Sequence, residues 1–270
     1  MIFKTIRFMP DAGEDVRLDA YLADPVSGFT RKAMLVIPGG GYGAVCSERE
    51  GEPIAHAFLA RGYNAFVLHY TVGRKKPYPA QLREASLAVA HIRENAAEYG
   101  IDPNKVFAVG FSAGGHLAGS LGTMWHREEA WKDLGFPFGA NRPDGVMLVY
   151  PVVSGVEPYG DCGTIRNLLC SDVTTPEERR VVSLECAADE RSSPLFLVHT
   201  SNDQGVDVRN SLVLASAYRE HGLEFEMHIY PDAPHGVALG NNITACGNPK
   251  WNNPRIARWV DDAAAWAESL

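Results

Sequence analysis

A serine flanked by glycines lies within the motif G-x-S-x-G at residues 110–114. An apolar run, residues 105–109, precedes this motif, and small residues follow it. In such a motif the chain turns sharply from a strand into a helix, so the serine oxygen is held where a substrate carbonyl can reach it. Side chains at Gly110 and Gly114 would crowd this turn. The pattern therefore predicts that Ser112 is the nucleophile of an acyl transfer.

A second glycine cluster, residues 39–43, directly follows another apolar run. Acyl transfer builds negative charge on the carbonyl oxygen, and glycines allow backbone N–H groups to approach that oxygen closely. We expect Gly40 and Gly41, together with the N–H of Ala113 after the nucleophile, to form an oxyanion hole. A generic turn is the alternative. The cluster lacks the G-K-[ST] ending of a phosphate-binding loop, and it does not match G-x-G-x-x-G in register.

Three side chains near this loop bear on the expected pocket. Tyr42 directly follows the two oxyanion glycines, so we expect it to line the substrate pocket. Glu48 and Glu50 come a few residues later. They either support the loop by hydrogen bonds or form an exposed charged pair at the start of a helix, and the sequence leaves both readings open.

An acid and a histidine follow the serine in the order that such a motif requires. Asp203 comes just after the strand-like run 195–200, and His235 comes just after the run 225–230. The carboxyl ends of parallel strands are where an open sheet places its ligand crevice. We therefore expect His235 to take the proton from Ser112, and Asp203 to orient the imidazole ring and stabilise its charged form.

Three other residues compete for these roles. His116 belongs to the helix that leaves the serine turn, so we expect it to be structural. Asp207 immediately precedes the helical pattern 208–221, and an N-cap role explains it well. Asp232 could orient His235 locally, although a turn role between neighbouring prolines also accounts for it.

The elements that must position these residues alternate between strand-like and helical patterns along the chain. This alternation requires right-handed crossovers and predicts an α/β fold, a mostly parallel central sheet of about eight strands with helices on both faces. An antiparallel pair is expected first, over residues 4–9 and 16–22. The other expected strands are residues 33–37, 64–72, 105–109, 145–153, 195–200 and 225–230, and the expected helices are residues 53–61, 80–99, 113–122, 208–221 and 254–268.

The length and composition favour one domain over residues 1–270, because 46% hydrophobic residues can form a sizeable core. Two stretches, residues 124–143 and 154–193, do not fit the alternation of strands and helices. Long connections at the carboxyl edge of such a sheet are usually functional. We therefore expect both to be cap-like insertions that line or roof the substrate pocket.

Charge and cysteine content exclude several classes of function. A net charge of −8 without a basic stripe argues against nucleic acid or an anionic membrane surface as the main partner, and favours a neutral small-molecule substrate. Five cysteines without C-x-x-C spacing predict neither a disulfide framework nor a metal site, and no cofactor is expected. The absence of a signal-like N-terminus and of a long apolar run predicts a cytoplasmic protein. The oligomeric state stays open, a homo-oligomer included.

Over nearly its whole length the chain resembles the α/β-hydrolase superfamily, and within it the bacterial acetylxylan esterase-like or feruloyl esterase-like esterases. The resemblance implies Ser112, Asp203 and His235 as the catalytic triad. Pro38 stands where the H-G-G-G motif usually has histidine, and Asp207 stands where relatives often have proline. The stretches that resemble the family are residues 37–42, 47–53, 99–103, 110–117, 150–153, 199–203 and 234–236.

This resemblance implies a serine carboxylesterase that acts on a small acyl ester, above all an acetyl group on a sugar or xylo-oligosaccharide. An arylformamidase or a peptidase would share the triad and differ in the pocket. A non-catalytic binding protein on the same scaffold is a further alternative, because a fold alone does not guarantee chemistry.

Overall fold

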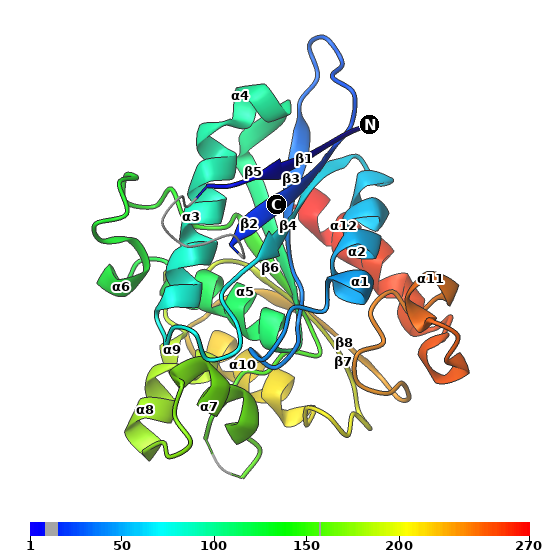
Figure 1. The fold of residues 1–270 in the computed structure, drawn as a ribbon. Coiled ribbons are helices and arrows are strands. Elements are labelled where there is room, and N and C mark those ends of the chain that lie inside the picture. Colours follow the sequence, from blue (N-terminus) through cyan, green and yellow to red (C-terminus); the bar gives the residue numbers. More distant parts are fainter. Residues whose placement is uncertain (9–15, 157) are drawn as a thin grey trace.

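In the computed structural model, which describes residues 1–8, 16–156 and 158–270, eight strands form one twisted sheet (Figure 1). The strand order is β1-β2-β4-β3-β5-β6-β7-β8. Strand β2 pairs antiparallel with β1 and β4, and all other neighbouring strands are parallel. The strands are β1 (Ile2–Ile6), β2 (Arg17–Leu22), β3 (Arg31–Ile37), β4 (Tyr63–His69), β5 (Ile101–Phe111), β6 (Gly145–Val149), β7 (Leu195–Thr200) and β8 (Phe225–Tyr230). The prediction of a mostly parallel eight-stranded sheet is confirmed.

The sheet separates two apolar cores because successive strand residues face opposite sides. In β3, Leu35 lies in one core, while Met34 and Val36 lie in the other, and all three are fully buried. Parallel strands buried on both faces read as continuous apolar runs, which explains why these strands could be found in the sequence. Helices α3 (Ala80–Glu94), α5 (Ala113–Met124) and α10 (Arg209–Glu220) cover one face, and α2 (Glu52–Leu59) and α12 (Trp259–Glu268) cover the other (Figure 1).

Several predicted elements are longer than the observed ones. The expected helix 80–99 is interrupted at Asn95, whose side-chain amide donates to the carbonyl oxygen of His91, so that a short α4 (Ala96–Tyr99) follows. The expected strand 64–72 ends at His69, because the N–H of Thr71 donates to the Glu84 carboxylate instead of a neighbouring strand. Of the expected first strand, residue 9 lies outside the described residues.

The boundaries of one further predicted strand and one further predicted helix also differ. The expected strand 145–153 ends at Val149, where Tyr150 adopts a positive φ of 38°. The expected helix 254–268 becomes a short 3-10 turn followed by α12, which begins at Trp259. Tyr150 therefore leaves the sheet directly at its carboxyl edge, next to the serine turn.

The expectation that residues 124–143 line or roof the pocket stays a prediction, and none of them is among the residues that line the cavity beside Ser112. The segment packs along α3, because Arg83 near the start of that helix donates to the Glu129 and Lys132 carbonyls. It contains α6 (Glu128–Trp131), and its end is held by Ser193, whose hydroxyl donates to the Pro143 carbonyl, and by Arg93, whose guanidinium donates to the Ala140 carbonyl. Asp144 then donates its N–H to Val106 near the start of the buried part of β5.

The second expected insertion, residues 154–193, follows the carboxyl end of β6 and contains α7 (Cys162–Leu169), α8 (Pro176–Val181) and α9 (Leu184–Ala187). The amide of Asn167 in α7 donates to the carbonyl oxygen of Gly41 at 2.8 Å. This segment therefore contacts the glycine loop (residues 39–43), and its expected role in lining or roofing the pocket stays a prediction. Within the described ranges, no helix combines the length and the apolar character needed to cross a lipid bilayer.

Candidate active site

Ser112 occupies the sharp turn between β5 and α5, with φ 53° and ψ −118°. Such a conformation is uncommon for a residue with a side chain and is tolerated where the surroundings fix it. The N–H of Ser112 donates to the Val149 carbonyl at 3.1 Å. A Cβ at Gly110 would lie 2.2 Å from the Gly114 carbonyl oxygen, and one at Gly114 would lie 2.1 Å from that of Ile37. The turn therefore requires both glycines, as the sequence predicts.

The structure brings Ser112, His235 and Asp203 into one hydrogen-bonded series. The Nε2 atom of His235 lies 2.9 Å from the Ser112 hydroxyl oxygen, and its Nδ1 atom lies 2.8 Å from a carboxylate oxygen of Asp203. His235 is in the loop after β8, and Asp203 is in the loop after β7. Because an ionised carboxylate only accepts, we assign the ring proton to Nδ1, which leaves Nε2 free to accept the serine proton.

Asp203 is held in its ionised form by its surroundings. Its side chain is 1% exposed, and its Oδ1 atom accepts the N–H groups of Gly205 at 2.7 Å and Val206 at 3.0 Å. Burial alone would raise the pKa of Asp203, but hydrogen bonds from His199 and His235 and the bond from Val206 hold that pKa well below its usual range. The carboxylate is therefore charged and fixed in orientation beside His235.

The glycine loop (residues 39–43) before α1 (Ser47–Glu50) has a backbone conformation that favours glycine. Gly40 and Gly41 have positive φ values of 125° and 61°. A Cβ at Gly40 would lie 2.3 Å from the Ala44 carbonyl oxygen, so only glycine fits there. Within the described part of the chain, the N–H groups of Gly40, Gly41 and Ala113 donate to no acceptor. They are therefore available to a substrate oxygen.

Tyr42 does not line the pocket, contrary to our expectation. Its side chain is 1% exposed, and its hydroxyl bonds to Nδ1 of His116 at 2.9 Å. The Nε2 atom of His116 bonds to the Val182 carbonyl at 2.7 Å, and burial lowers the pKa of His116 to about 4. A positive φ of 55° at Tyr42 turns the side chain away from the loop surface into the core. His116 is structural, as expected, because both ring nitrogens are occupied away from Ser112.

The rival acids also have other partners. Asp207 forms an ion pair with Arg209 at 2.6 Å and accepts the Arg209 N–H at 2.8 Å, so it stabilises the start of α10. Asp232 is exposed and accepts the side-chain amide of Asn202 at 2.7 Å. Asp203 is therefore the carboxylate that contacts His235.

A cavity of about 290 Å³ opens beside the serine. Sequence reasoning did not place Cys46, Arg49 or Gly236 in it. The Arg49 guanidinium packs over the Trp251 ring, 3.8 Å from its centroid, and donates to the Gly236 carbonyl. The signal for Arg49 was the stretch 47–53 and that for Gly236 was the stretch 234–236, both of which resemble the family, whereas Cys46 lies outside these stretches. The cavity is lined by Gly40, Gly41, Cys46, Arg49, Glu50, Ser112, His235 and Gly236.

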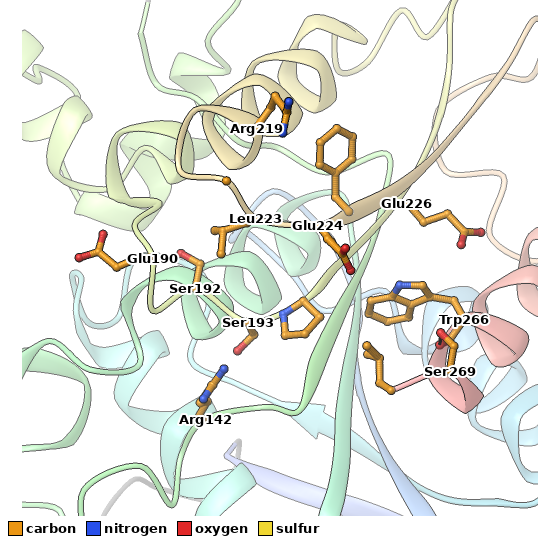
Figure 2. Close-up of a pocket in the computed structure, with 14 residues that line it drawn as sticks. Arg142, Glu190, Ser192, Ser193, Arg219, Leu223, Glu224, Glu226, Trp266 and Ser269 are labelled. Atoms are coloured by element: carbon orange, nitrogen blue, oxygen red, sulfur yellow. Dashed lines mark hydrogen bonds between the residues drawn. The ribbon is translucent and has the colours of Figure 1, made fainter.

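A larger cavity, of about 840 Å³, lies at the amino edge of β7 and β8 (Figure 2). Arg142 and Arg219 lie on opposite sides of it, and Trp266 contributes an aromatic wall. Among the described residues that line this cavity there is no histidine or cysteine. The hydroxyl of Ser193 is already engaged with the Pro143 carbonyl. The larger cavity therefore offers no nucleophile with a base beside it.

Two protein-family models match the two parts of the chain that contain these loops. The BD-FAE family model matches residues 18–145, and the prolyl oligopeptidase family model matches residues 169–246. The first match includes the glycine loop and Ser112, and the second includes Asp203 and His235.

Individual proteins are similar over most of the chain. Endo-1,4-beta-xylanase B of Butyrivibrio fibrisolvens is 40% identical over 78% of the chain, and an acetylxylan esterase of Xylanibacter ruminicola is 28% identical over 77%. The chain spans only 33% and 42% of those two proteins. The crystal structure of an acetyl ester-xyloside bifunctional hydrolase from Caldicellulosiruptor lactoaceticus has a TM-score of 0.83 and 30% identity, covering 98% of this chain and 96% of that one.

Proposed function

Because the chain belongs to the acetylxylan esterase-like and feruloyl esterase-like members of the α/β-hydrolase superfamily, we propose that it is a serine carboxylesterase that hydrolyses small acyl esters. The observation that carries this proposal is the series of hydrogen bonds from Ser112 through His235 to Asp203, at 2.9 Å and 2.8 Å. A hydroxyl, an imidazole and a charged carboxylate in this order form the arrangement that activates a serine for acyl transfer.

The first half of the proposed reaction acylates the serine. Nε2 of His235 accepts the Ser112 proton as the serine oxygen attacks the ester carbonyl carbon, and the carbonyl oxygen becomes negative. The N–H groups of Gly40, Gly41 and Ala113 stabilise that charge, and each such donor contributes about 3 kcal/mol to the transition state. The carbon–oxygen bond to the alcohol then breaks, and His235 returns the proton to the departing alcohol oxygen.

The second half hydrolyses the acyl-serine. A water molecule attacks the acyl carbon and gives a proton to Nε2 of His235, and the same backbone N–H groups stabilise the new negative oxygen. The bond to Ser112 breaks, the serine regains its proton from His235, and a carboxylic acid is released. Asp203 favours the imidazolium in both halves because it is charged and bonded to Nδ1.

We propose acetyl esters of sugars or xylo-oligosaccharides as the substrate class. The cavity beside Ser112 measures about 290 Å³, which suits a short acyl group with the sugar outside. The names of an acetylxylan esterase and of an acetyl ester-xyloside hydrolase among the similar proteins support this choice.

Amide hydrolysis is the second candidate, because the prolyl oligopeptidase model matches the segment that contains Asp203 and His235. A peptidase and an arylformamidase would use the same serine on a different carbonyl. The difference would reside in the pocket and not in the triad, so substrates must separate the candidates.

The test compares wild type with Ser112→Ala on acetylated xylo-oligosaccharides, 4-nitrophenyl acetate, a feruloyl sugar ester, an N-formyl aromatic amide and short peptides. We expect kcat/KM to be highest for the acetyl sugars and to be lost in the variant. A wild type that cleaves the amide or the peptides faster than every ester would overturn the ester assignment. Ester turnover that persists in the variant would overturn the serine mechanism.

A further inference from the structure

A second carboxylate is buried beside the serine. Glu50 ends α1, is 4% exposed and lines the same cavity as Ser112 and His235. Its Oε2 atom accepts the N–H of Gly39 at 2.8 Å, directly before the two oxyanion glycines. The other carboxylate oxygen, Oε1, accepts the hydroxyl of Tyr150 at 2.9 Å. Both oxygens therefore act as acceptors, as those of an ionised carboxylate do.

Tyr150 extends this contact to the histidine loop. Its hydroxyl oxygen accepts the N–H of Ala238 at 2.9 Å, so its own proton is available to Glu50. The ring of Tyr150 packs against the ring of His235 in an edge arrangement, with centroids 5.0 Å apart and planes at 64°. Glu50 therefore binds the oxyanion loop directly and binds the histidine loop through one tyrosine.

We propose that Glu50 is a positioning residue for this active site, which holds the oxyanion loop and the His235 loop in register and favours the imidazolium form of His235 by its negative charge. The inference rests on the proposed esterase function and adds a residue to it. Glu50 makes no hydrogen bond to the His235 ring, so it acts alongside Asp203 and does not replace it.

Charged and titratable groups meet around Glu50 from several elements. Burial raises the pKa of Glu50, while the bonds from Gly39 and Tyr150 and the nearby His235 and Arg49 favour its ionised form. Arg49 also donates to the Gly236 carbonyl next to His235. The groups that face Glu50 or His235 are Cys46 and Arg49 near α1, Tyr70 after β4, Tyr150 after β6, Asp203 after β7 and His235 after β8.

Glu84 provides a matched control on the opposite face of the sheet. It lies in α3, is 1% exposed, and its two carboxylate oxygens accept the N–H of Thr71 at 2.7 Å and the Thr71 hydroxyl at 2.6 Å. Burial raises the pKa of Glu84, as it does for Glu50. Glu84 does not line the cavity beside Ser112. The Glu84→Gln substitution should therefore destabilise its surroundings about as much as Glu50→Gln does, but it changes no residue that lines the cavity beside Ser112.

The experiment follows the titration of the His235 ring by NMR in the full chain labelled at histidine Cε1, with His235→Ala to assign the signal. In Glu50→Gln we expect the titration midpoint to fall by about half a pH unit, because a negative charge near the ring is lost. The acid limb of kcat/KM should move by the same amount, and kcat for 4-nitrophenyl acetate should fall about tenfold with a smaller change in KM. Glu84→Gln should leave both midpoints in place.

An unchanged His235 midpoint in folded Glu50→Gln would overturn the electrostatic role. If Glu50→Gln does not fold, Tyr150→Phe tests the mechanical role, because it breaks the link and keeps the Glu50 charge. We expect kcat to fall at least threefold in Tyr150→Phe without a shift of the midpoint, and wild-type kcat would contradict the link. The NMR titration needs no substrate, so a wild type without esterase activity would refute the proposed function and still leave the charge effect measurable.

Discussion

The two cavities at opposite edges of the sheet differ in size and in chemistry. The one at the carboxyl edge measures about 290 Å³, and the one at the amino edge measures about 840 Å³. The smaller cavity has Ser112 in a strained turn with His235 in hydrogen-bond contact, whereas the larger has arginines and glutamates around an aromatic wall. Hydrogen-bonded groups converge on the Ser112 oxygen at the smaller cavity, so this convergence, and not volume, identifies the candidate active site.

Topology explains this difference. Strands β3, β5, β6, β7 and β8 run in the same direction, so the loops that follow them meet at one edge. Each of these loops contributes to the smaller cavity or to the groups behind it: the glycine loop, Ser112, Tyr150, Asp203 and His235. The opposite edge receives the ends of the helices that return along the sheet.

The largest effect should come from Ser112→Ala at the smaller cavity. We expect turnover of 4-nitrophenyl acetate to fall by on the order of 10⁴-fold or more, because removal of the nucleophile disables the whole series. Ser120→Ala is the matched control, since Ser120 lies in α5, the helix that follows Ser112, is buried, and donates to the His116 carbonyl at 2.9 Å. Its activity should stay near wild type. Equal losses in both variants would show that disturbance of α5, and not loss of the nucleophile, reduces the rate.

The next effect separates the two acids of the β7 loop. Asp203→Asn should lower kcat by about 10³- to 10⁴-fold, because an amide in that place favours the wrong tautomer of His235. Asp207→Asn removes only the ion pair with Arg209, and we expect kcat within about threefold of wild type. Steady-state kinetics on an acetyl ester measure both. The reverse order of effects would assign the role of the acid to Asp207.

The acid limb of the pH profile of kcat/KM should reflect the uptake of a single proton. Asp203 has a pKa held well below its usual range, so it stays ionised while the histidine base gains its proton. We expect kcat/KM to fall about tenfold per pH unit below the midpoint. The stability that ionised Asp203 contributes to the fold is fully present above a pH of about 4 and is lost only as the pH falls further. The acid limb of kcat/KM therefore reflects protonation of the base and not unfolding of the protein. A slope near two, or a flat limb, would contradict a single base.

The smallest effect is expected at the larger cavity. Arg219→Ala alters its charged rim, and we expect kcat and KM for acetyl esters within about twofold of wild type. The same kinetic assay as for Ser112→Ala measures this. A tenfold or greater loss in a folded Arg219→Ala protein would mean that the amino edge takes part in the reaction and that our comparison of the two edges fails.

The series Ser112, His235 and Asp203 could be predicted from the sequence because each member lies in a loop that follows a parallel strand. The strands before Ser112 and Asp203 are continuous buried runs, whereas β8, before His235, is a partly buried edge strand that was recognised by its position in the alternation of strands and helices. The glycines of the serine turn could be predicted for the same local reason, since the turn geometry allows no side chain there.

Features that depend on packing between distant segments could not be predicted. Tyr42 follows the oxyanion glycines in sequence, yet a positive φ and a bond to His116 send its ring into the core. The role of Glu50 stayed open because its two partners, Gly39 and Tyr150, lie on different strand ends. The path of the segment 124–143 could not be predicted either, because its contacts with Arg83 and Arg93 of α3 join residues far apart in the sequence.

The central claim is that Ser112 is the activated nucleophile of this chain. Its most direct test is labelling with a fluorophosphonate, followed by intact mass and peptide mapping of wild type and Ser112→Ala. The account predicts one adduct per chain, on Ser112, formed in step with the loss of esterase activity and absent from the variant. An adduct on another residue, or full ester turnover by a protein that takes up no label, would contradict it.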